Sequence, residues 1–186
     1  AGLLGKTTIG IDGSKFKAVN SKKNNYNEKK IDKYRQFITD KAEKYLQELD
    51  ELDKQESNSD ELQIKKEKIA EGLAKLKERT IKYDTLQEQL NNTDDKQIST
   101  TDAESRSIII VKNIVEVAYN TQNAVDDKHN LIVHTEATNR NDGKALYNAA
   151  TQAKQNLQLQ KEDKLMVLAD KGYHTGAELQ QCQKEN

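Results

Sequence analysis

Apolar positions change their spacing along the chain, and each spacing predicts a different kind of element. Residues 7–19 mix β-branched and polar side chains and predict a strand, with a turn signal at Asp12-Gly13. Between residues 28 and 92 apolar side chains recur every three or four residues, which predicts two amphipathic helices. A short polar connection at 56–60 separates them, so we expect the helices to be antiparallel neighbours with narrow, coiled-coil-like apolar stripes.

The second half of the chain predicts a mixture of strands and helices. Residues 114–125 and 131–138 are rich in Val, Ile and Thr and flank a polar turn, which predicts a β-hairpin. A helix is expected from about residue 142. The continuous apolar run 165–169 follows it, and such a run is typical of a strand buried on both faces. A last helix is expected to begin after Thr175.

This order of elements predicts an α/β fold. Without the helical segment the order is β-β-β-α-β-α, which is that of an RNase H-like mixed sheet with its first strand parallel to the strand after the first helix. We expect residues 1–27 and 93–186 to form this sheet domain. Residues 28–92 would then be an inserted helical arm, whose simplest role is structural, with DNA or partner binding as the alternative.

Two aspartates are the strongest candidates for chemistry. Asp12 and Asp170 each stand at or near the carboxyl end of a predicted strand, with a glycine just after. On neighbouring strands they would offer two hard oxygen ligands to Mg²⁺ or Mn²⁺, although Asp-Gly alone is also a common turn. A second acidic pair, Asp126 and Asp127, lies in the predicted hairpin turn, and we expect it to serve the turn.

Charge is unevenly distributed along the 186 residues. Charged residues make up 33% of the chain and hydrophobic residues only 34%, so a portion of the chain is expected to be an elongated, solvated element. The net charge is −1, yet residues 1–35 carry nine basic and three acidic side chains. This excess of positive charge surrounds Asp12, as phosphate contact would require, and a solvated lysine-rich surface is the alternative. The candidate phosphate contacts are Lys15, Lys17, Lys22, Lys23 and Lys171.

Cysteine content and hydropathy narrow the class of protein further. Cys182 is the only cysteine, which excludes an internal disulfide framework and a cysteine-built zinc site. No apolar run is long enough to cross a membrane, and no signal peptide is visible. We therefore expect a cytoplasmic protein with no membrane partner.

The residues around both aspartates resemble a known family. The segments 11–20, 119–133 and 169–173 resemble bacterial insertion-sequence transposases of the DDE class, in the branch with a helical hairpin inserted after the first core strand. The run 97–102 is also similar to that branch. The Thr-Asp-Pro-Asp-Ala-Arg motif usual there reads Thr-Asp-Ala-Glu-Ser-Arg at 101–106, without the proline and with Glu in place of Asp.

The resemblance implies a metal-dependent enzyme of DNA transposition. In that family two aspartates and a glutamate hold two divalent ions that serve DNA cleavage and strand transfer, and the aspartates match Asp12 and Asp170. The glutamate lies on a later helix, so we expect the third ligand, and with it activity of this chain alone, to be missing. Glu178 lies too soon after Asp170, and we expect it to be the capping-box partner of Thr175.

Partners and alternatives follow from the same resemblance. The expected partners are transposon ends and target DNA in the bacterial nucleoid. The expected cofactor is Mg²⁺ or Mn²⁺. Whether the chain forms a homo-oligomer is left open. An RNase H-like nuclease on the same fold would hydrolyse DNA without joining strands. An inactive remnant, or a structural coiled-coil interaction protein, would bind no metal at the two aspartates.

Overall fold

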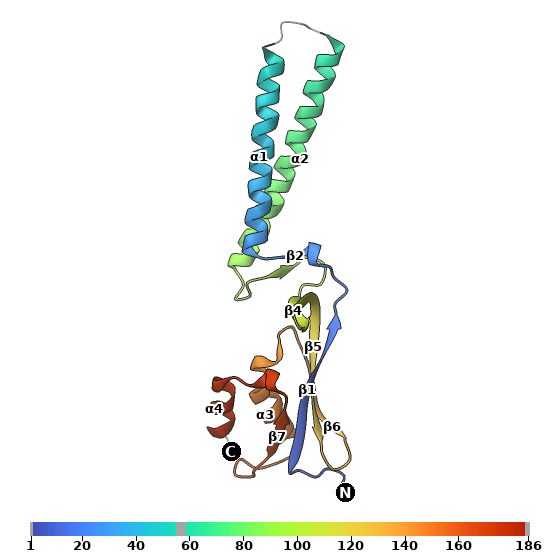
Figure 1. The fold of residues 1–186 in the computed structure, drawn as a ribbon, viewed down its shortest axis with the longest axis vertical. Coiled ribbons are helices and arrows are strands. Elements are labelled where there is room, and N and C mark those ends of the chain that lie inside the picture. The colour runs from blue at the N-terminus through green and yellow to red at the C-terminus, as the bar shows by residue number, and fades with distance from the viewer. Residues whose placement is uncertain (1, 55–58, 185–186) are drawn as a thin grey trace. The chain divides into compact units, whose positions relative to one another are not determined.

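The computed structural model describes residues 2–54 and 59–184 and has a mixed α/β architecture, as predicted (Figure 1). Contacts divide the chain into two compact units, Ala1–Asn25 with Ser99–Asn186, and Tyr26–Ile98. The first unit contains the mixed sheet. The second contains the two long helices. The short strands β2 (Asn25–Tyr26) and β3 (Ile98–Ser99) pair with each other where the chain passes from one unit to the other.

The sheet is built around one long strand, β5. Its members are β1 (Thr8–Lys17), β4 (Arg106–Val111), β5 (Ile114–Asp126), β6 (Ile132–Thr138) and β7 (Met166–Ala169). β5 pairs antiparallel with β1, with β4 along its first half and with β6 along its second half. β7 pairs parallel with β1, which confirms the expectation that the first strand and the strand after the first helix are parallel neighbours.

β4 is a strand that the apolar spacing does not predict. No element is predicted between the helical segment 28–92 and the strand expected at 114–125. Residues Ile108–Val111 form a short apolar run, which carries no periodicity by which a strand can be told from a buried loop. Lys112 at the tip has a φ of 48°, a left-handed conformation that lets β4 turn directly into β5.

The helices α1 (Glu28–Asp53) and α2 (Asp60–Asn91) confirm the helical prediction for the second unit. Asn27 and Ser59 cap them, each accepting a hydrogen bond from a backbone N–H three residues later. Residues 56–58 of the predicted connection lie outside the described residues. None of the helices among the described residues combines the length and the apolar character needed to cross a bilayer.

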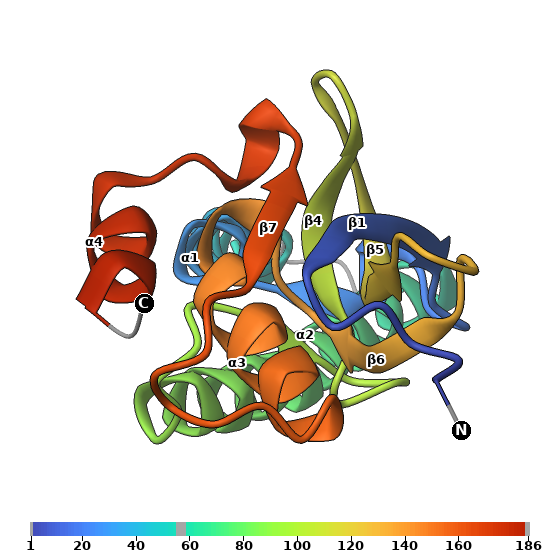
Figure 2. The same cartoon turned by 90° about the horizontal axis from the view of Figure 1, so that it is seen from below.

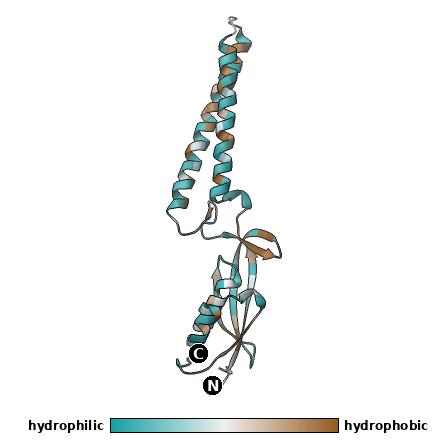
Figure 3. Cartoon of the chain, turned by 60° about the vertical axis from the view of Figure 1, so that its left-hand side comes forward, coloured by the Kyte–Doolittle hydropathy of each residue, from teal (hydrophilic) through white to brown (hydrophobic). Residues whose placement is uncertain are grey.

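α1 and α2 pack against each other in opposite directions. Tyr34 of α1 stacks on Tyr83 near the end of α2, with ring centroids 5.0 Å apart, whereas Lys66 near the start of α2 pairs with Asp53 at the end of α1. Most of both helix surfaces is hydrophilic, with hydrophobic residues spaced along the helices (Figure 3). Most buried residues of the two helices recur at the expected spacing of three and four: Ile31, Ile38, Leu52, Leu62, Ile69, Leu76, Tyr83 and Leu90. Leu86 of α2 is also buried, and the prediction did not include it.

One face of the sheet carries the apolar core of the first unit. The helices α3 (Leu146–Asn156) and α4 (Gly176–Lys184) lie near each other beside β7 (Figure 2). Ile9 and Ile11 of β1 and Ala124 of β5 belong to the same buried cluster as the helix side chains. The apolar side of α3 and the residues flanking it belong to this cluster, at Ala145, Leu146, Ala149, Ala153 and Leu157. The described part of the unit also contains the 3₁₀ turns Lys22–Asn24, Asp142–Lys144 and Lys171–Tyr173.

The prediction that the strand at 165–169 is buried on both faces is wrong for the described residues. Val167 packs against the core, but Met166 and Leu168 on the other face are 62% and 57% exposed. β7 is four residues long and pairs only with β1, so it stands at the edge of the sheet. An uninterrupted apolar run therefore marks a strand here without showing that both of its faces are covered.

Glu178 has a different role from the predicted one. Thr175 caps α4 as expected, because its Oγ1 accepts from the Glu178 N–H at 3.4 Å. The Glu178 carboxylate does not complete the capping box and instead accepts the Tyr147 N–H in the first turn of α3 at 2.9 Å. Ala145, the residue before α3, offers no side-chain cap, so Glu178 supplies the missing acceptor from another helix.

Replacing Glu178 with Ala should therefore destabilise the first unit. Removal of a helix cap leaves a backbone donor unpaired and costs about 1 kcal/mol. Glu162→Ala, an exposed glutamate of the same unit, is the matched control and should leave stability unchanged. Urea unfolding measures both variants, and equal stabilities for the two would show that Glu178 is not the cap of α3.

Candidate functional site

The two predicted aspartates lie side by side on parallel strands. Ile11 pairs with Ala169 at the end of the β1–β7 ladder, so Asp12 and Asp170 are the next residues along the two chains. Asp170 has an extended backbone, with φ −72° and ψ 174°, and thus continues the direction of β7. Residues in register on parallel strands point to the same face of a sheet. Both aspartates alternate with the core residues Ile11 and Val167, and they are exposed.

Each of these carboxylates is held by its own backbone. Asp12 Oδ1 accepts the Gly13 N–H at 2.8 Å, and Asp170 Oδ1 accepts the Gly172 N–H at 2.7 Å. No described residue donates a hydrogen bond to either Oδ2, so each side chain keeps an oxygen for an external cation. Two carboxylates suit Mg²⁺ or Mn²⁺. Among the described residues no three His, Cys, Asp or Glu side chains gather in a group that could hold an ion.

A buried polar network lies behind Asp12, on the core face of the sheet. Its centre is Asp142, in the 3₁₀ turn before α3. Asp142 Oδ2 accepts from the Lys15 ammonium at 2.7 Å, and Oδ1 accepts from the side-chain amides of Asn120 at 2.8 Å and Gln122 at 3.0 Å. The Lys15 and Asp142 side chains are only 19% and 17% exposed. The network therefore ties the turn before α3 to both β1 and β5.

Gly13 makes room for this network. A Cβ at residue 13 would lie 2.6 Å from Asp142 Oδ1, 2.6 Å from Gln122 Nε2 and 2.9 Å from Asn120 Oδ1. These distances are too short for any side chain, so the glycine after the first aspartate serves the close approach of three polar groups. Gly13 continues strand β1, and the turn signal at Asp12-Gly13 does not produce a turn.

The charge of Asp142 is stabilised by its partners. Burial by itself would raise the pKa of the Asp142 carboxyl, but the hydrogen bonds from Lys15, Asn120 and Gln122 outweigh burial and lower that pKa. The carboxylate is thus ionised in the folded state. It already accepts hydrogen bonds on both oxygens, which makes it a poor candidate for a third metal ligand.

Tyr173 extends the network toward Asp170. Its hydroxyl donates to Gln122 Oε1. Burial, followed by the negative charges of Asp142, Asp12 and Asp170, raises the pKa of the Tyr173 hydroxyl, so this group stays neutral and acts as a donor. Because Tyr173 is buried three residues after Asp170, its contact with Gln122 fixes the turn that carries the second aspartate.

The second acidic pair serves the hairpin, as predicted. Asp126 Oδ1 accepts the Gly5 N–H at 2.8 Å and Oδ2 accepts the Lys128 N–H at 3.0 Å. Burial would raise the pKa of Asp126, but these backbone donors, with those of Lys6 and His129, lower it instead. Asp126 therefore closes the β5–β6 turn and holds the N-terminal segment. Asp127 is exposed in that turn.

The predicted phosphate-binding lysines occupy different environments. Lys15 belongs to the buried network and pairs with Asp142. Lys17 and Lys22 both lie near Glu116, with N–O distances of 3.9 and 3.5 Å. Lys23 and Lys171 are exposed. The structure thus brings Asp12 and Asp170 together but does not gather these five lysines into one unpaired basic surface.

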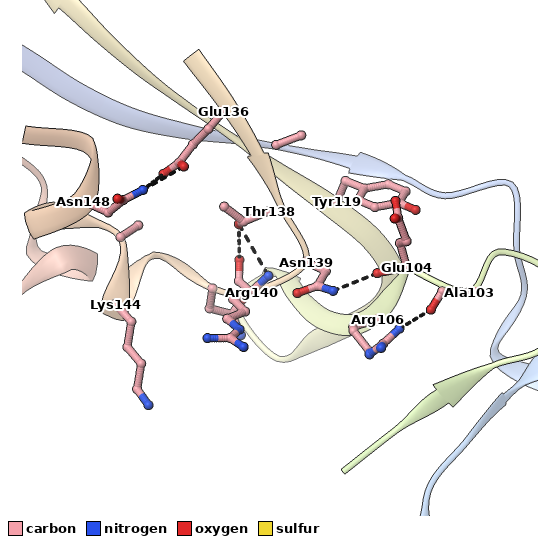
Figure 4. A pocket seen from close by; sticks show the side chains of 13 residues that line it. Ala103, Glu104, Arg106, Tyr119, Glu136, Thr138, Asn139, Arg140, Lys144 and Asn148 are labelled. Carbon is pink, nitrogen blue, oxygen red and sulfur yellow. Dashed lines mark hydrogen bonds between the residues drawn. The ribbon is translucent and has the colours of Figure 1, made fainter. Parts of the chain in front are cut away.

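A separate cavity of about 720 Å³ lies between the loop at 103–104, β6 and the turn before α3 (Figure 4). Arg106, Arg140 and Lys144 line it together with Glu104 and Glu136. Tyr119 at the same cavity donates to Asp102 Oδ1 at 2.6 Å, and this hydrogen bond, with burial, raises the pKa of Tyr119 to about 12.

Comparisons with known proteins identify no relative. No protein-family model matches the sequence, and neither the curated proteins nor the solved structures include a significant match.

Sequence reasoning missed the residues of the network and of the cavity. Asn120 and Gln122 are buried at alternate positions of β5, but residues 119–123 are all polar or aromatic, so no alternation shows which face is covered. A signal for Asp142 existed in the Asp-Gly pair at 142–143, which resembles the pair at 12–13. Its partner Lys15 is 127 residues away, and only the folded sheet joins the two.

Gly13→Ala should destabilise the protein because the new methyl group would displace the Asp142 network. Overpacking of this kind costs about 1–3 kcal/mol. Gly10→Ala on the same strand is the matched control, since a Cβ at residue 10 meets no atom within 4 Å. Thermal unfolding of both variants checks the expectation, and equal melting temperatures would contradict the close approach at Gly13.

Asp142→Asn should lower stability by about 1–3 kcal/mol at neutral pH, because the partly buried Lys15 ammonium loses its negative partner. The folded-state pKa of Asp142 is depressed, so its contribution is present above its unfolded pKa of about 4 and fades as the pH falls through the folded value. The difference from wild type should therefore shrink in acid. The exposed Asp94→Asn is the control, and a pH-independent difference would contradict the ion pair.

Proposed function

We propose that this chain is a catalytic-core segment of a DDE-class transposase, acting on DNA phosphodiesters in the bacterial cytoplasm. The observation that carries the proposal is the pairing of β1 with β7, which sets Asp12 beside Asp170 on one face of the sheet. Each of these carboxylates has an oxygen without a described donor. Paired carboxylates of this kind are what a divalent-ion site for phosphodiester chemistry requires.

The order of the strands supports the proposal independently. Both β4 and β6 pair with β5, and β1 and β7 follow on the other side of β5; only β5 runs opposite to the others. The order β6, β5, β1, β7 is the one that an RNase H-like core would have. The contacts between α1 and α2 likewise fit a helical hairpin inserted after the first strand, the feature of the branch that the sequence resembles.

The carboxylate oxygens of Asp12 and Asp170 are suitable ligands for a divalent ion, but two acidic residues are one fewer than the family uses. Asp12 and Asp170 would hold Mg²⁺ or Mn²⁺, which when bound activates a water or a 3′-hydroxyl and stabilises the leaving oxygen. Asp142 is excluded as the third acidic ligand because Lys15, Asn120 and Gln122 already occupy its oxygens. We therefore propose that this segment binds the ion weakly and that transposition needs a further carboxylate.

Mn²⁺ should stabilise the wild-type chain and should not stabilise Asp12→Asn or Asp170→Asn. Without metal the adjacent carboxylates repel, so both variants should melt above the wild type in EDTA. With Mn²⁺ the order should reverse, and the Kd should weaken by at least about tenfold in either variant, equivalent to about 1.4 kcal/mol. Calorimetric titration and thermal unfolding with and without Mn²⁺ measure both effects.

Asp127→Asn, which removes an exposed charge from the same unit, is the matched control and should behave as wild type. Equal Mn²⁺ affinity in wild type, Asp12→Asn and Asp170→Asn would refute the metal site and the function based on it. For a longer chain that cleaves DNA, joining of a labelled strand to a target distinguishes a transposase from a nuclease, which only hydrolyses.

A further inference from the structure

The cavity beside the turn before α3 has the side chains of an anion site. Arg106 comes from the start of β4, Arg140 from the loop after β6, and Lys144 from the 3₁₀ turn that follows. The Arg140 and Lys144 side chains extend from the ribbon at the cavity (Figure 4). Arg106 turns toward Ala103, and its Nη1 donates to the carbonyl oxygens of Ala103 and Ser105 at 2.6 and 2.8 Å. Three segments of the chain thus contribute one cation each to a single hollow of about 720 Å³.

Arg140 and Lys144 lack a counter-charge within the described residues. Both side chains are exposed and make no hydrogen bond or ion pair with another described residue. The lysines of the N-terminal basic segment differ, since Lys15 pairs with Asp142 and both Lys17 and Lys22 lie near Glu116. Arg140 and Lys144 therefore leave positive charge at the cavity for an external anion.

The two acidic side chains of the cavity, Glu104 and Glu136, interact with groups other than Arg140 and Lys144. Both oxygens of Glu136 accept from the Asn148 side-chain amide, at 2.8 and 3.0 Å. Glu104 lies near the Tyr119 hydroxyl, whose pKa it helps to raise, and this places its charge on the tyrosine side of the cavity. The half that carries Arg140 and Lys144 keeps a net positive charge.

We propose that Arg106, Arg140 and Lys144 form a phosphate-binding site that holds the sugar-phosphate backbone of DNA. Guanidinium groups bind phosphate oxygens through paired N–H donors, and a lysine adds a point charge. An open cavity with an exposed cationic edge can hold a continuous DNA strand by its phosphates. Because it makes no contact with base edges, the binding would not depend on the DNA sequence. The phosphate chemistry follows from the cavity, whereas the choice of DNA as its source rests on the proposed function.

The test is DNA binding by the full 186-residue chain with Arg140→Ala and Lys144→Ala combined. Fluorescence anisotropy with a labelled duplex of about 20 base pairs, without divalent ions, measures the Kd from about 50 to 200 mM salt. The loss of two phosphate contacts should flatten the dependence of log K on log[salt] by about 1.8. At the lowest salt we expect binding to weaken by about tenfold on every sequence alike, since phosphate contacts carry no sequence information.

Two further variants make the test specific. Lys161→Ala with Lys164→Ala removes the same charge from exposed sites of the same unit and should bind as wild type. Arg140→Lys with Lys144→Arg keeps the charge and should retain most of the binding. A cavity variant that binds DNA with the wild-type Kd and salt slope would overturn the proposal, and so would equal losses in the cavity and control variants.

Inorganic phosphate and pyrophosphate distinguish the source of the anion. If either binds the cavity at low millimolar concentration while the duplex does not bind, the site takes a free phosphate and the assignment to DNA is wrong. Metal binding at Asp12 and Asp170 should be unchanged in the cavity variants. The experiments can therefore refute the phosphate-site proposal and the metal-site proposal independently of each other.

Discussion

The partly buried carboxylate of Asp142 is the constraint on which the geometry of the α/β unit depends. A charge with so little exposure is costly unless it is paired and fully hydrogen-bonded. Lys15 from β1 and two amides from β5 meet this requirement, and they can do so only because residue 13 has no side chain. One interaction therefore fixes how the first strand, the central strand and the turn before α3 fit together.

Apolar and polar regions of this face form one continuous layer. Ile11 lies opposite Ala124 in the apolar region, and Gly13, the next residue of β1 on the same face, lies opposite Gln122 in the polar region. Tyr173 joins the two regions, because its ring lies in the apolar cluster and its hydroxyl reaches Gln122. The turn that carries Asp170 is held by this tyrosine. Asp12 and Asp170, on the opposite face of the sheet, are thus positioned by the Asp142 network and by Tyr173 on the core face.

The helices and strands that follow from the spacing of apolar residues were predictable from the sequence. The stripes of α1, α2 and α3 appear as apolar residues three and four apart, and the residues of β5 and β6 appear as two β-branched runs around a polar turn. Asp12 and Asp170 could be paired in advance because each follows a strand signal. The pairing of Lys15 with Asp142 was not predictable, since charged residues of a strand look alike whether they face solvent or a buried partner.

The exposure of β7 and the role of Glu178 show a further limit of sequence reasoning. A capping-box pattern predicts only a partner within the same helix. In the folded chain the Glu178 carboxylate instead lies at the uncapped start of α3, a helix that the local pattern does not include. The same applies to surface charge. Lysine density is highest near Asp12, yet Lys15, Lys17 and Lys22 lie against acidic groups from β5 and from the turn before α3.

The most direct test of this account is the paramagnetic effect of Mn²⁺ on the amide NMR signals of the full chain. Substoichiometric Mn²⁺ should broaden signals at 10–13 and 169–172 together, because one ion would contact both strand ends. Asp170→Asn should abolish the broadening at both segments. Broadening at only one segment, or an effect centred on acidic residues elsewhere in the chain, would contradict a shared site at Asp12 and Asp170.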